Sequence, residues 1–313
     1  TGGGGDALSV VAIVGPTGAG KSAVAEALAE TSGATIVSID SMQVYRGMDI
    51  GTAKAPVDVR ERIPHRMVDI VDPTEEFTVK EFQTAGRTAI ANVTDNGGRV
   101  VIAGGSGLHF RALVDPMTFA PSDAAVRSSL EPLSVAELRH RLLAVDANAA
   151  AVVDVANPRR LIRALEVHEL TGETPTMRAS TNEARKLAGY EAFLPMTAFG
   201  IDPGERLKAS VDERFRSMLD HGLLEEVAAL DSRLGRTASQ AVGYKELIPV
   251  VRGETPLQDA TEAAIAATRA LVKRQRTYFR RDPRIEWLPW QDVTSKNVEA
   301  AVAEIRERVA WTS

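Results

Sequence analysis

The chain has 313 residues, of which 44% are hydrophobic and 25% charged, and its formal net charge is −5 at pH 7. This composition is typical of a globular protein with one large domain or two, and the acidic balance argues against a generally basic nucleic-acid binder while allowing a local basic patch. The absence of cysteine excludes disulfides and thiolate metal sites, and the five histidines lack metal-ligand spacing. No apolar run approaches the roughly 20 residues that cross a bilayer, and no signal peptide is visible, so we expect a cytoplasmic protein with no membrane contact.

The first predicted elements are a strand, a glycine-rich loop and a helix. Residues 8–14 (LSVVAIV) form an apolar run typical of a buried parallel strand, and Ser22–Thr31 has helical spacing that ends before Gly33. Between them lies GPTGAGKS, which fits the phosphate-loop pattern of a glycine, four residues and Gly-Lys-Ser. The loop and the helix N-terminus aim backbone N–H groups at one point and so predict a pyrophosphate pocket. Its residues are Gly15, Pro16, Thr17, Gly18, Ala19, Gly20, Lys21 and Ser22.

Two side chains of this loop are expected to contact the ligand or its metal. Lys21 brings a positive charge to the pyrophosphate, and the Ser22 hydroxyl is the predicted ligand of Mg²⁺, the cofactor that the loop indicates. The loop alone does not distinguish a bound nucleotide such as ATP from another diphosphate.

Further polar residues follow the next strands of the predicted sheet. Ala34–Ile39 is a second buried strand that delivers Asp40 to the edge where doubly wound sheets place their chemistry. Asp40 is a candidate general base or indirect Mg²⁺ ligand, and the alternative is an ordinary turn residue. After irregular residues 42–79, a helix to Thr94 begins at Thr78, its predicted cap. The third strand, residues 99–103, leads to Ser106, a candidate donor to the substrate whose alternative is a helix cap.

A helical, Ala/Arg-rich segment interrupts this α/β pattern. Residues 116–185 show little strand character, and the clearest helices are Ser134–Leu143 and Pro158–Leu170, the second with Asn157 as its cap. We therefore predict a phosphate-loop α/β fold, with a doubly wound, mainly parallel sheet flanked by helices and a helical insertion. The predicted core covers residues 6–115 and 190–313, and residues 116–189 form the insertion, interpreted as a lid.

The chain returns to strand at Phe193–Ile201 and later at Ile285–Leu288, with helices between and after them. The longest predicted helix, Thr261–Arg280, carries a stripe of cations at helical spacing with no acid among them. Such a stripe is typical of a phosphate-backbone track, and the alternative is a solvated helix face. Its members are Arg269, Lys273, Arg276, Arg280 and Arg284, of which the last follows a helix-ending proline.

A second basic group opens the insertion helix at Arg159, Arg160 and Arg163. Cations at a helix N-terminus oppose the helix dipole, so a bound phosphate would compensate them. The alternative is pairing with Glu166 or Glu169 within the helix.

These features together resemble one family, the tRNA dimethylallyltransferases, also called isopentenyl-tRNA transferases. The matching segments run in the family's order over nearly the whole chain, and the second is highly specific because ordinary phosphate-loop kinases lack it. They are residues 15–22 (GPTGAGKS), 38–54 (SIDSMQVYRGMDIGTAK), 64–65 (PH), 104–108 (GGSGL), 157–166 (NPRRLIRALE), 241–245 (AVGYK) and 267–275 (ATRALVKRQ).

The resemblance implies transfer of a dimethylallyl group from its diphosphate to N6 of the adenosine 3′ to a tRNA anticodon. It implies that the phosphate loop holds the diphosphate, that Asp40 accepts the N6 proton, that Ser106 lies near the reacting centre and that Arg214 neutralises the diphosphate. From the residues alone, Arg214 would be a surface arginine. The partners implied are the tRNA anticodon stem-loop and dimethylallyl diphosphate, and we expect a monomer.

The resemblance also implies a set of tRNA-binding residues. They are Asp40, Ser41, Met42, Gln43, Ser106, Arg127, Arg159, Arg160, Leu161, Ile162, Arg163, Gln240, Ala241, Val242, Gly243, Tyr244 and Lys245. Arg269, Lys273 and Arg276 of the stripe are added to this set.

The chain departs from the family pattern in a few places. Ser106 replaces the usual threonine, His109 replaces the usual tyrosine, and Ser210 stands where the Arg214 segment often has an arginine. The missing cysteines leave out the zinc finger of eukaryotic members, which implies a bacterial-type enzyme. Two other interpretations are a phosphate-loop kinase for a nucleotide or small molecule and a non-catalytic RNA-binding module.

Overall fold

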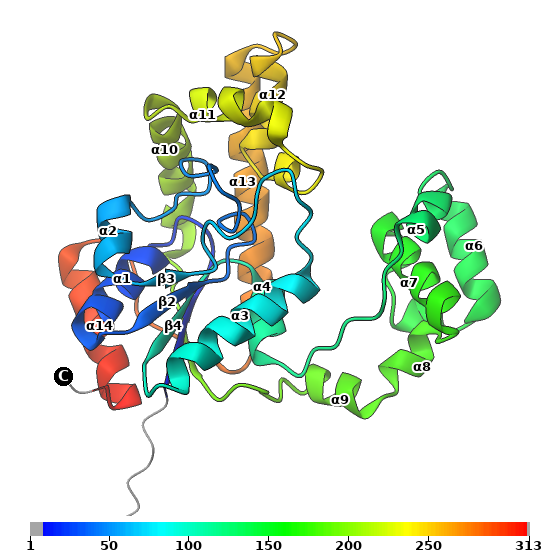
Figure 1. The fold of residues 1–313 in the computed structure, drawn as a ribbon, viewed down its shortest axis with the longest axis horizontal. Coiled ribbons are helices and arrows are strands. Elements are labelled where there is room, and N and C mark those ends of the chain that lie inside the picture. Colours follow the sequence, from blue (N-terminus) through cyan, green and yellow to red (C-terminus); the bar gives the residue numbers. More distant parts are fainter. Residues whose placement is uncertain (1–8, 312–313) are drawn as a thin grey trace, which may run out of the picture. The chain divides into compact units, whose positions relative to one another are not determined.

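The computed structural model describes residues 9–311 (Figure 1). Contacts between Cα atoms divide the chain into two compact units, unit 1 with residues 9–114 and 194–311, and unit 2 with Asp115–Phe193. Residues 6–8, which the sequence analysis assigned to the core and in part to the first strand, lie outside the described residues.

Unit 1 is built on a six-stranded, all-parallel sheet with strand order β3-β2-β4-β1-β5-β6. The strand order confirms the predicted α/β class. The order reverses at β1, and sheets of this kind bind ligands in the crevice that forms at the carboxyl ends of the strands at such a point. The strands are β1 Val10–Val14, β2 Thr35–Ser38, β3 His65–Arg66, β4 Val100–Gly104, β5 Thr197–Gly200 and β6 Ile285–Trp287.

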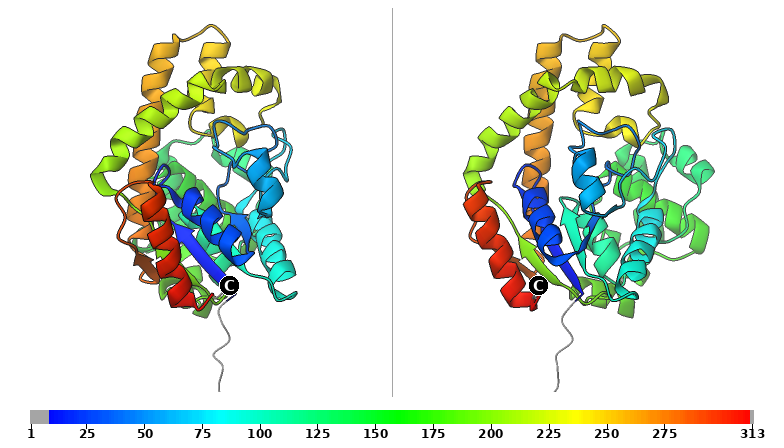
Figure 2. Two further views of the ribbon diagram at one scale, coloured as in Figure 1. Left: turned by 90° about the vertical axis from the view of Figure 1, so that its left-hand side faces the viewer. Right: turned by 60° about the vertical axis from the view of Figure 1, so that its left-hand side comes forward.

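Both faces of the sheet are covered because alternate residues of its strands point to opposite sides. Val11 and Ile13 of β1 pack with α1 (Lys21–Ser32) and α14 (Ser295–Val309), which lie side by side in Figure 2. Val10, Ala12 and Val14 belong to a second cluster on the other face. The helices of that face are α3 Val79–Thr94, α4 Gly107–Val114 and α13 Leu257–Phe279.

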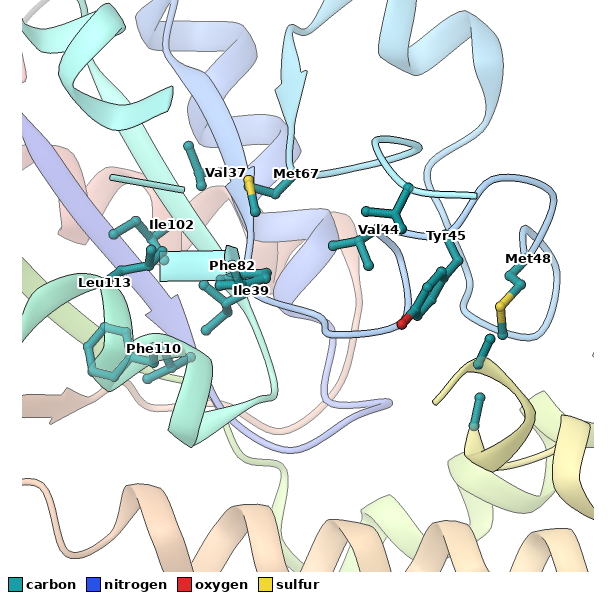
Figure 3. Packing of buried hydrophobic residues seen from close by; sticks show 14 of the residues in the cluster. Val37, Ile39, Val44, Tyr45, Met48, Met67, Phe82, Ile102, Phe110 and Leu113 are labelled. Carbon is teal, nitrogen blue, oxygen red and sulfur yellow. The ribbon is translucent and has the colours of Figure 1, made fainter. Parts of the chain in front are cut away.

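The second cluster continues into the segment after β2. Figure 3 shows Phe82 of α3 and Phe110 of α4 packed beside Ile39, and the same cluster includes Tyr45 and Met48. The side chain of Lys54 is 1% exposed and pairs with Asp49 and Asp69. The segment is therefore held in place by apolar packing and ion pairs, although it contains little regular structure.

The prediction that residues 42–79 are irregular is wrong for part of this segment. It contains helix α2, Val57–Arg62, and the two-residue strand β3, which adds an edge to the sheet. Helix α2 has no buried residue, and β3 is too short to show alternation, so neither carries a periodic pattern. The predicted cap of α3 is confirmed, because Thr78 and Glu81 form a reciprocal capping box.

Four helices between β5 and β6 complete unit 1: α10 Leu207–Asp220, α11 Leu223–Leu230, α12 Tyr244–Val251 and α13. Helix α13 contacts both α10 and α12. It ends at Phe279, so Arg284 lies beyond it and pairs with Asp282 instead of continuing the stripe. Across residues 9–311, no helix combines the length and the apolar character that crossing a membrane requires.

Unit 2 is helical and has its own core, formed by leucines of three helices, Leu130, Leu138, Leu142, Leu161 and Leu165. The helices are α5 Ala124–Leu130, α6 Val135–Val145, α7 Pro158–Thr171, α8 Pro175–Ala179 and α9 Asn182–Ala188. The predicted start and end of α7 are confirmed, because Asn157 caps its first turn and Gly172 ends it in the left-handed conformation.

Glu166 of α7 is a fully buried carboxylate that connects α7 to α5 and to the segment before α5. It pairs with Arg163 at 2.6 Å and Arg127 at 3.0 Å, and it accepts hydrogen bonds from the Ser122 hydroxyl and the Asp123 amide. Burial raises the pKa of Glu166, but hydrogen bonds from Arg163, Arg127 and Ser122 outweigh it and lower the pKa to about 2.

We predict that the stability of α5 and α7 depends on pH through Glu166. Its pKa is lower in the folded state, so its contribution is complete above pH 4.5, the ordinary value, and is lost as the pH falls towards about 2. Glu166→Gln should remove this dependence and cost about 1.5–3 kcal/mol. Hydrogen exchange of the α5 and α7 amides measures both effects. Glu169→Gln, exposed on the same helix, is the control and should retain the wild-type profile.

Candidate functional site

Two adjoining cavities lie at the carboxyl edge of the sheet in unit 1. The loop cavity, of about 260 Å³, is lined by the phosphate loop, including Lys21 and Ser22. The apolar cavity, of about 460 Å³, is lined largely by apolar side chains, namely Met42, Leu108, Val211, Phe215, Met218, Leu271 and Tyr278. Seven residues line both cavities and define the boundary between them, Thr17, Gly18, Asp40, Thr52, Gly105, Arg214 and Gln275.

Distant parts of the chain hold the phosphate loop in its conformation. Gly15 has φ +148°, and a Cβ atom there would lie 2.1 Å from the Ile201 carbonyl oxygen, so only glycine fits. The Thr17 amide donates to Gln275 Oε1 at 2.8 Å, and Trp290 Nε1 donates to the Ala19 carbonyl at 2.8 Å. Helix α1 then begins at Lys21, with its N-terminus at the loop cavity.

Two cations border the loop cavity. Lys21 is 8% exposed, and its ammonium donates to the Pro16 carbonyl at 2.6 Å. Burial, followed by the charge of Arg214, lowers the pKa of Lys21 to about 7, and the Asp40 carboxylate opposes this shift. Burial also lowers the pKa of Arg214, which forms no ion pair with an acid within residues 9–311. Two cations that are largely removed from water and form no ion pair within residues 9–311 favour an anionic ligand in this cavity.

Asp40 follows β2 and faces both cavities. Its Oδ1 accepts from the Met42 amide at 2.9 Å, and its own amide donates to the Ser38 hydroxyl at 3.2 Å. The Oδ2 atom has no hydrogen-bond partner within the described part of the chain and can therefore accept a proton. Asp40 thus has the hydrogen bonds of a turn residue, which was the alternative to a general base. Its Oδ2 nevertheless remains free at the boundary of the cavities.

Ser106, on the loop after β4, lines the apolar cavity. Its hydroxyl is hydrogen-bonded to His109 Nδ1 at 2.6 Å, and the His109 ring packs edge-on against Phe82. Burial lowers the pKa of His109 to about 4, so the imidazole is neutral at pH 7 and fixes the orientation of the serine hydroxyl.

Residues 43–282 match the model of a protein family that is described as "IPP transferase". The chain is a member of this family. It is 40% identical to a tRNA dimethylallyltransferase of Pseudarthrobacter chlorophenolicus over 90% of this chain and 94% of the relative, and 41% identical to one of Parafrankia sp. over 96% and 92%. A solved tRNA delta(2)-isopentenylpyrophosphate transferase of Staphylococcus epidermidis has a TM-score of 0.70 and 31% identity, covering 97% of this chain and 99% of that chain. These relatives support a transferase of this family and not the kinase alternative.

Fourteen of the predicted site residues lie together in this member of the IPP transferase family. Those that line one or both cavities are Thr17, Gly18, Gly20, Lys21, Ser22, Asp40, Ser41, Met42, Gln43, Ser106, Arg214, Gln240, Ala241 and Val242. Arg214 is therefore a cavity residue, and its interpretation as a surface residue is wrong. Tyr244 is 0% exposed, so its side chain is not available to contact RNA.

The basic stripe of α13 is largely paired within the protein. Arg276 forms two hydrogen bonds with Asp202, which is 4% exposed, and Arg269 pairs with Asp212. The acids come from other segments, so the helix sequence alone did not reveal them. Lys273 is exposed and has no acidic partner within residues 9–311.

A different face of α13 lines the apolar cavity, and the sequence pattern did not predict it. Its residues are Thr268, Leu271, Arg274, Gln275 and Tyr278. Tyr278 borders the cavity and is partly exposed. Gln275 belongs to the segment 267–275, which resembles the family, and this was the one sign in the sequence that it lies at the site. The resemblance implied no role for Gln275 itself.

The residues around Ser22 fit a divalent metal cation that is held mainly by the ligand and water. Ser22, Glu26 and Asp40 line the loop cavity, but residues 9–311 contain no group of three or more acids or histidines that would form a complete cage. Mg²⁺ commonly uses few protein oxygens together with phosphate oxygens and water. The Ser22 hydroxyl, supported through water by the carboxylates, would hold the ion.

Because the pKa of Lys21 is about 7, we predict that inorganic pyrophosphate binds more weakly as the pH rises above 7. The neutral amine cannot attract the anion, so affinity should fall by up to about tenfold per pH unit above the pKa of Lys21 in the free protein, until the pH at which Lys21 is also neutral in the complex. Calorimetric titration between pH 6 and 9 measures this. Lys21→Met separates the titration of the lysine from that of the ligand, and parallel profiles for the two proteins would contradict the prediction.

Proposed function

We propose that this protein transfers a dimethylallyl group from dimethylallyl diphosphate to N6 of the adenosine 3′ to the anticodon of tRNA, releasing pyrophosphate. One observation carries the proposal: Asp40 and Arg214 lie at the boundary between a cationic cavity that suits a diphosphate and an apolar cavity that suits a prenyl chain and a base. The Asp40 carboxylate and the Arg214 guanidinium thus lie where the adenine N6 and the leaving diphosphate would come together.

The reaction places opposite demands on the two sides of this boundary. The bond between N6 and C1 forms while the bond between C1 and the diphosphate oxygen breaks, and the leaving group keeps the electron pair. Lys21 and Arg214 stabilise the growing negative charge of the diphosphate. Asp40 accepts the proton that N6 loses, because its Oδ2 is free and its orientation is fixed by the Met42 amide. Mg²⁺, when bound, adds positive charge at the diphosphate.

The acceptor base must leave its stack to enter the apolar cavity. Ser41, Met42 and residues 240–242 form the part of the wall that we assign to the base, with Ser106 close to the reacting atoms. We assign the exposed Lys273 and Lys245 to the neighbouring RNA surface, whereas Gly243 is buried.

Unit 2 supplies further candidates for binding the tRNA anticodon stem-loop. A cavity of about 730 Å³ within it is lined by four arginines, Arg159, Arg160, Arg163 and Arg178. Arg159 has no acidic partner within residues 9–311, whereas Arg163 and Arg127 share Glu166. We propose that this arginine cluster, with Leu161 and Ile162 as its helical support, binds phosphates of a tRNA in the cytoplasm. We propose that the enzyme acts as a monomer.

Product analysis tests the proposed function. The protein is incubated with dimethylallyl diphosphate, Mg²⁺ and total tRNA, and nucleosides are examined by mass spectrometry. A dimethylallyl mass gain on adenosine, with release of pyrophosphate, is expected. Transfer of a phosphoryl group from labelled ATP, without a prenylated nucleoside, would instead support a kinase.

We predict that Asp40→Asn lowers the turnover number by about 10²–10⁴-fold, because an amide cannot accept the N6 proton. Affinity for tRNA should remain near that of the wild type, since the substitution preserves the shape of the cavity wall. Single-turnover kinetics and filter binding measure the two quantities. Asp58→Asn, an exposed position on α2, is the control. Full activity of Asp40→Asn would exclude Asp40 as the base.

A further inference from the structure

The carboxylate of Glu226, on α11, binds three successive backbone amides of a loop that is distant in sequence. Its Oε2 accepts from the amides of Asp49 at 2.8 Å and Ile50 at 2.7 Å, and its Oε1 accepts from the Gly51 amide at 3.1 Å. The Tyr244 hydroxyl donates a further, short hydrogen bond to Oε1. A nest of amides of this kind has a strong preference for an anion.

The loop that Glu226 holds, residues 49–53, forms part of the wall of the apolar cavity. Gly51 and Thr52 line this cavity, and Thr52 also lines the loop cavity. A Cβ atom at Gly51 would lie 2.4 Å from the Tyr244 ring and 2.9 Å from Leu223. The loop is therefore pressed against α11 and α12, and its position depends on contacts with these helices.

A series of hydrogen bonds connects this loop to Asp40. Gln43 Nε2 donates to the carbonyls of Thr52 at 3.0 Å and Ala53 at 3.3 Å. Gln43 Oε1 accepts from the Ser38 hydroxyl at 2.8 Å, and that hydroxyl accepts from the Asp40 amide at 3.2 Å. A shift of the loop would thus be transmitted to the residue at the boundary of the two cavities.

Glu226 reaches a second part of the cavity wall through Tyr244. This tyrosine is fully buried at the start of α12, and residues 240–242, which precede it, line the apolar cavity. Burial, followed by the hydrogen bond and the charge of Glu226, raises the pKa of Tyr244, which keeps the hydroxyl protonated as a donor. One carboxylate therefore joins two wall segments that are far apart in the sequence.

We propose that Glu226 is a positioning residue for the transfer reaction, which fixes the loop 49–53 and residues 240–242 in the arrangement that admits the acceptor base. Glu226 acts through these segments, without touching the substrate. The inference rests on the proposed function, and it assigns to Glu226 a role on the acceptor side of the site rather than the diphosphate side.

Glu226→Gln is the decisive substitution. In glutamine, one of the two carboxylate oxygens is replaced by an NH₂ group, which is a donor. The backbone amides that donate to that oxygen therefore lose their acceptor. We expect kcat/KM for tRNA to fall by about 10–100-fold, while the affinity for inorganic pyrophosphate stays within about twofold of the wild type. Hydrogen exchange of the amides of residues 49–51 should become faster. Glu225→Gln, on the exposed neighbour in α11, is the matched control and should change neither quantity.

A second variant separates positioning from a general folding defect. Tyr244→Phe removes one donor and leaves the three amide hydrogen bonds, so its loss of kcat/KM should be smaller. The double variant should be no worse than Glu226→Gln alone, because Tyr244 acts through Glu226. Wild-type kcat/KM in Glu226→Gln would overturn the inference, as would a parallel loss of pyrophosphate binding. A wild-type protein that forms no prenylated adenosine would overturn the proposed function and this inference with it.

Discussion

Three charged side chains from different elements line one cavity, and the fold has to keep them together: Lys21 of α1, Arg214 of α10 and Asp40 after β2. Burial lowers the pKa of both cations, the charge of Arg214 lowers the pKa of Lys21 further, and the Asp40 carboxylate opposes both shifts. The fold has to hold these charges in place, and an anion in the same space would offset the excess of positive charge. The parallel sheet provides that rigidity, since its strands end at one edge and bring the loop after β1 and the turn after β2 together.

The sequence allowed the sheet, the phosphate loop, Asp40 and Ser106 to be predicted, because strand periodicity and parallel topology determine where the residues after each strand must lie. It did not predict the face of α13 that borders the apolar cavity. The charges of Arg269 and Arg276 suggested a nucleic-acid surface, but Asp212 and Asp202, from other segments, pair with them. A pattern within one helix cannot reveal partners that only tertiary folding supplies. The two residues of β3 are likewise too few to show alternation.

The arginines of unit 2 show the same limitation in a milder form. Pairing of Arg163 with Glu166 was one of two alternatives, and the structure adds Arg127 and Ser122 to the same carboxylate. A buried acid with several donors orients the arginine side chains and still leaves part of their surface exposed. Structural and phosphate-binding roles are therefore compatible in these residues, since a guanidinium offers five N–H donors.

The hydrogen bond from Trp290 to the Ala19 carbonyl, and that from the Thr17 amide to Gln275, have a consequence for the order of biosynthesis. The side chains that brace the glycine motif lie 258 and 271 residues further along the chain, so the ribosome makes them long after the motif itself. The central strand β1 also waits for β5 before it gains its second neighbour. A nascent chain would therefore carry the motif long before it could bind a diphosphate, and that ability would arise only after Gln275 and Trp290 had been added.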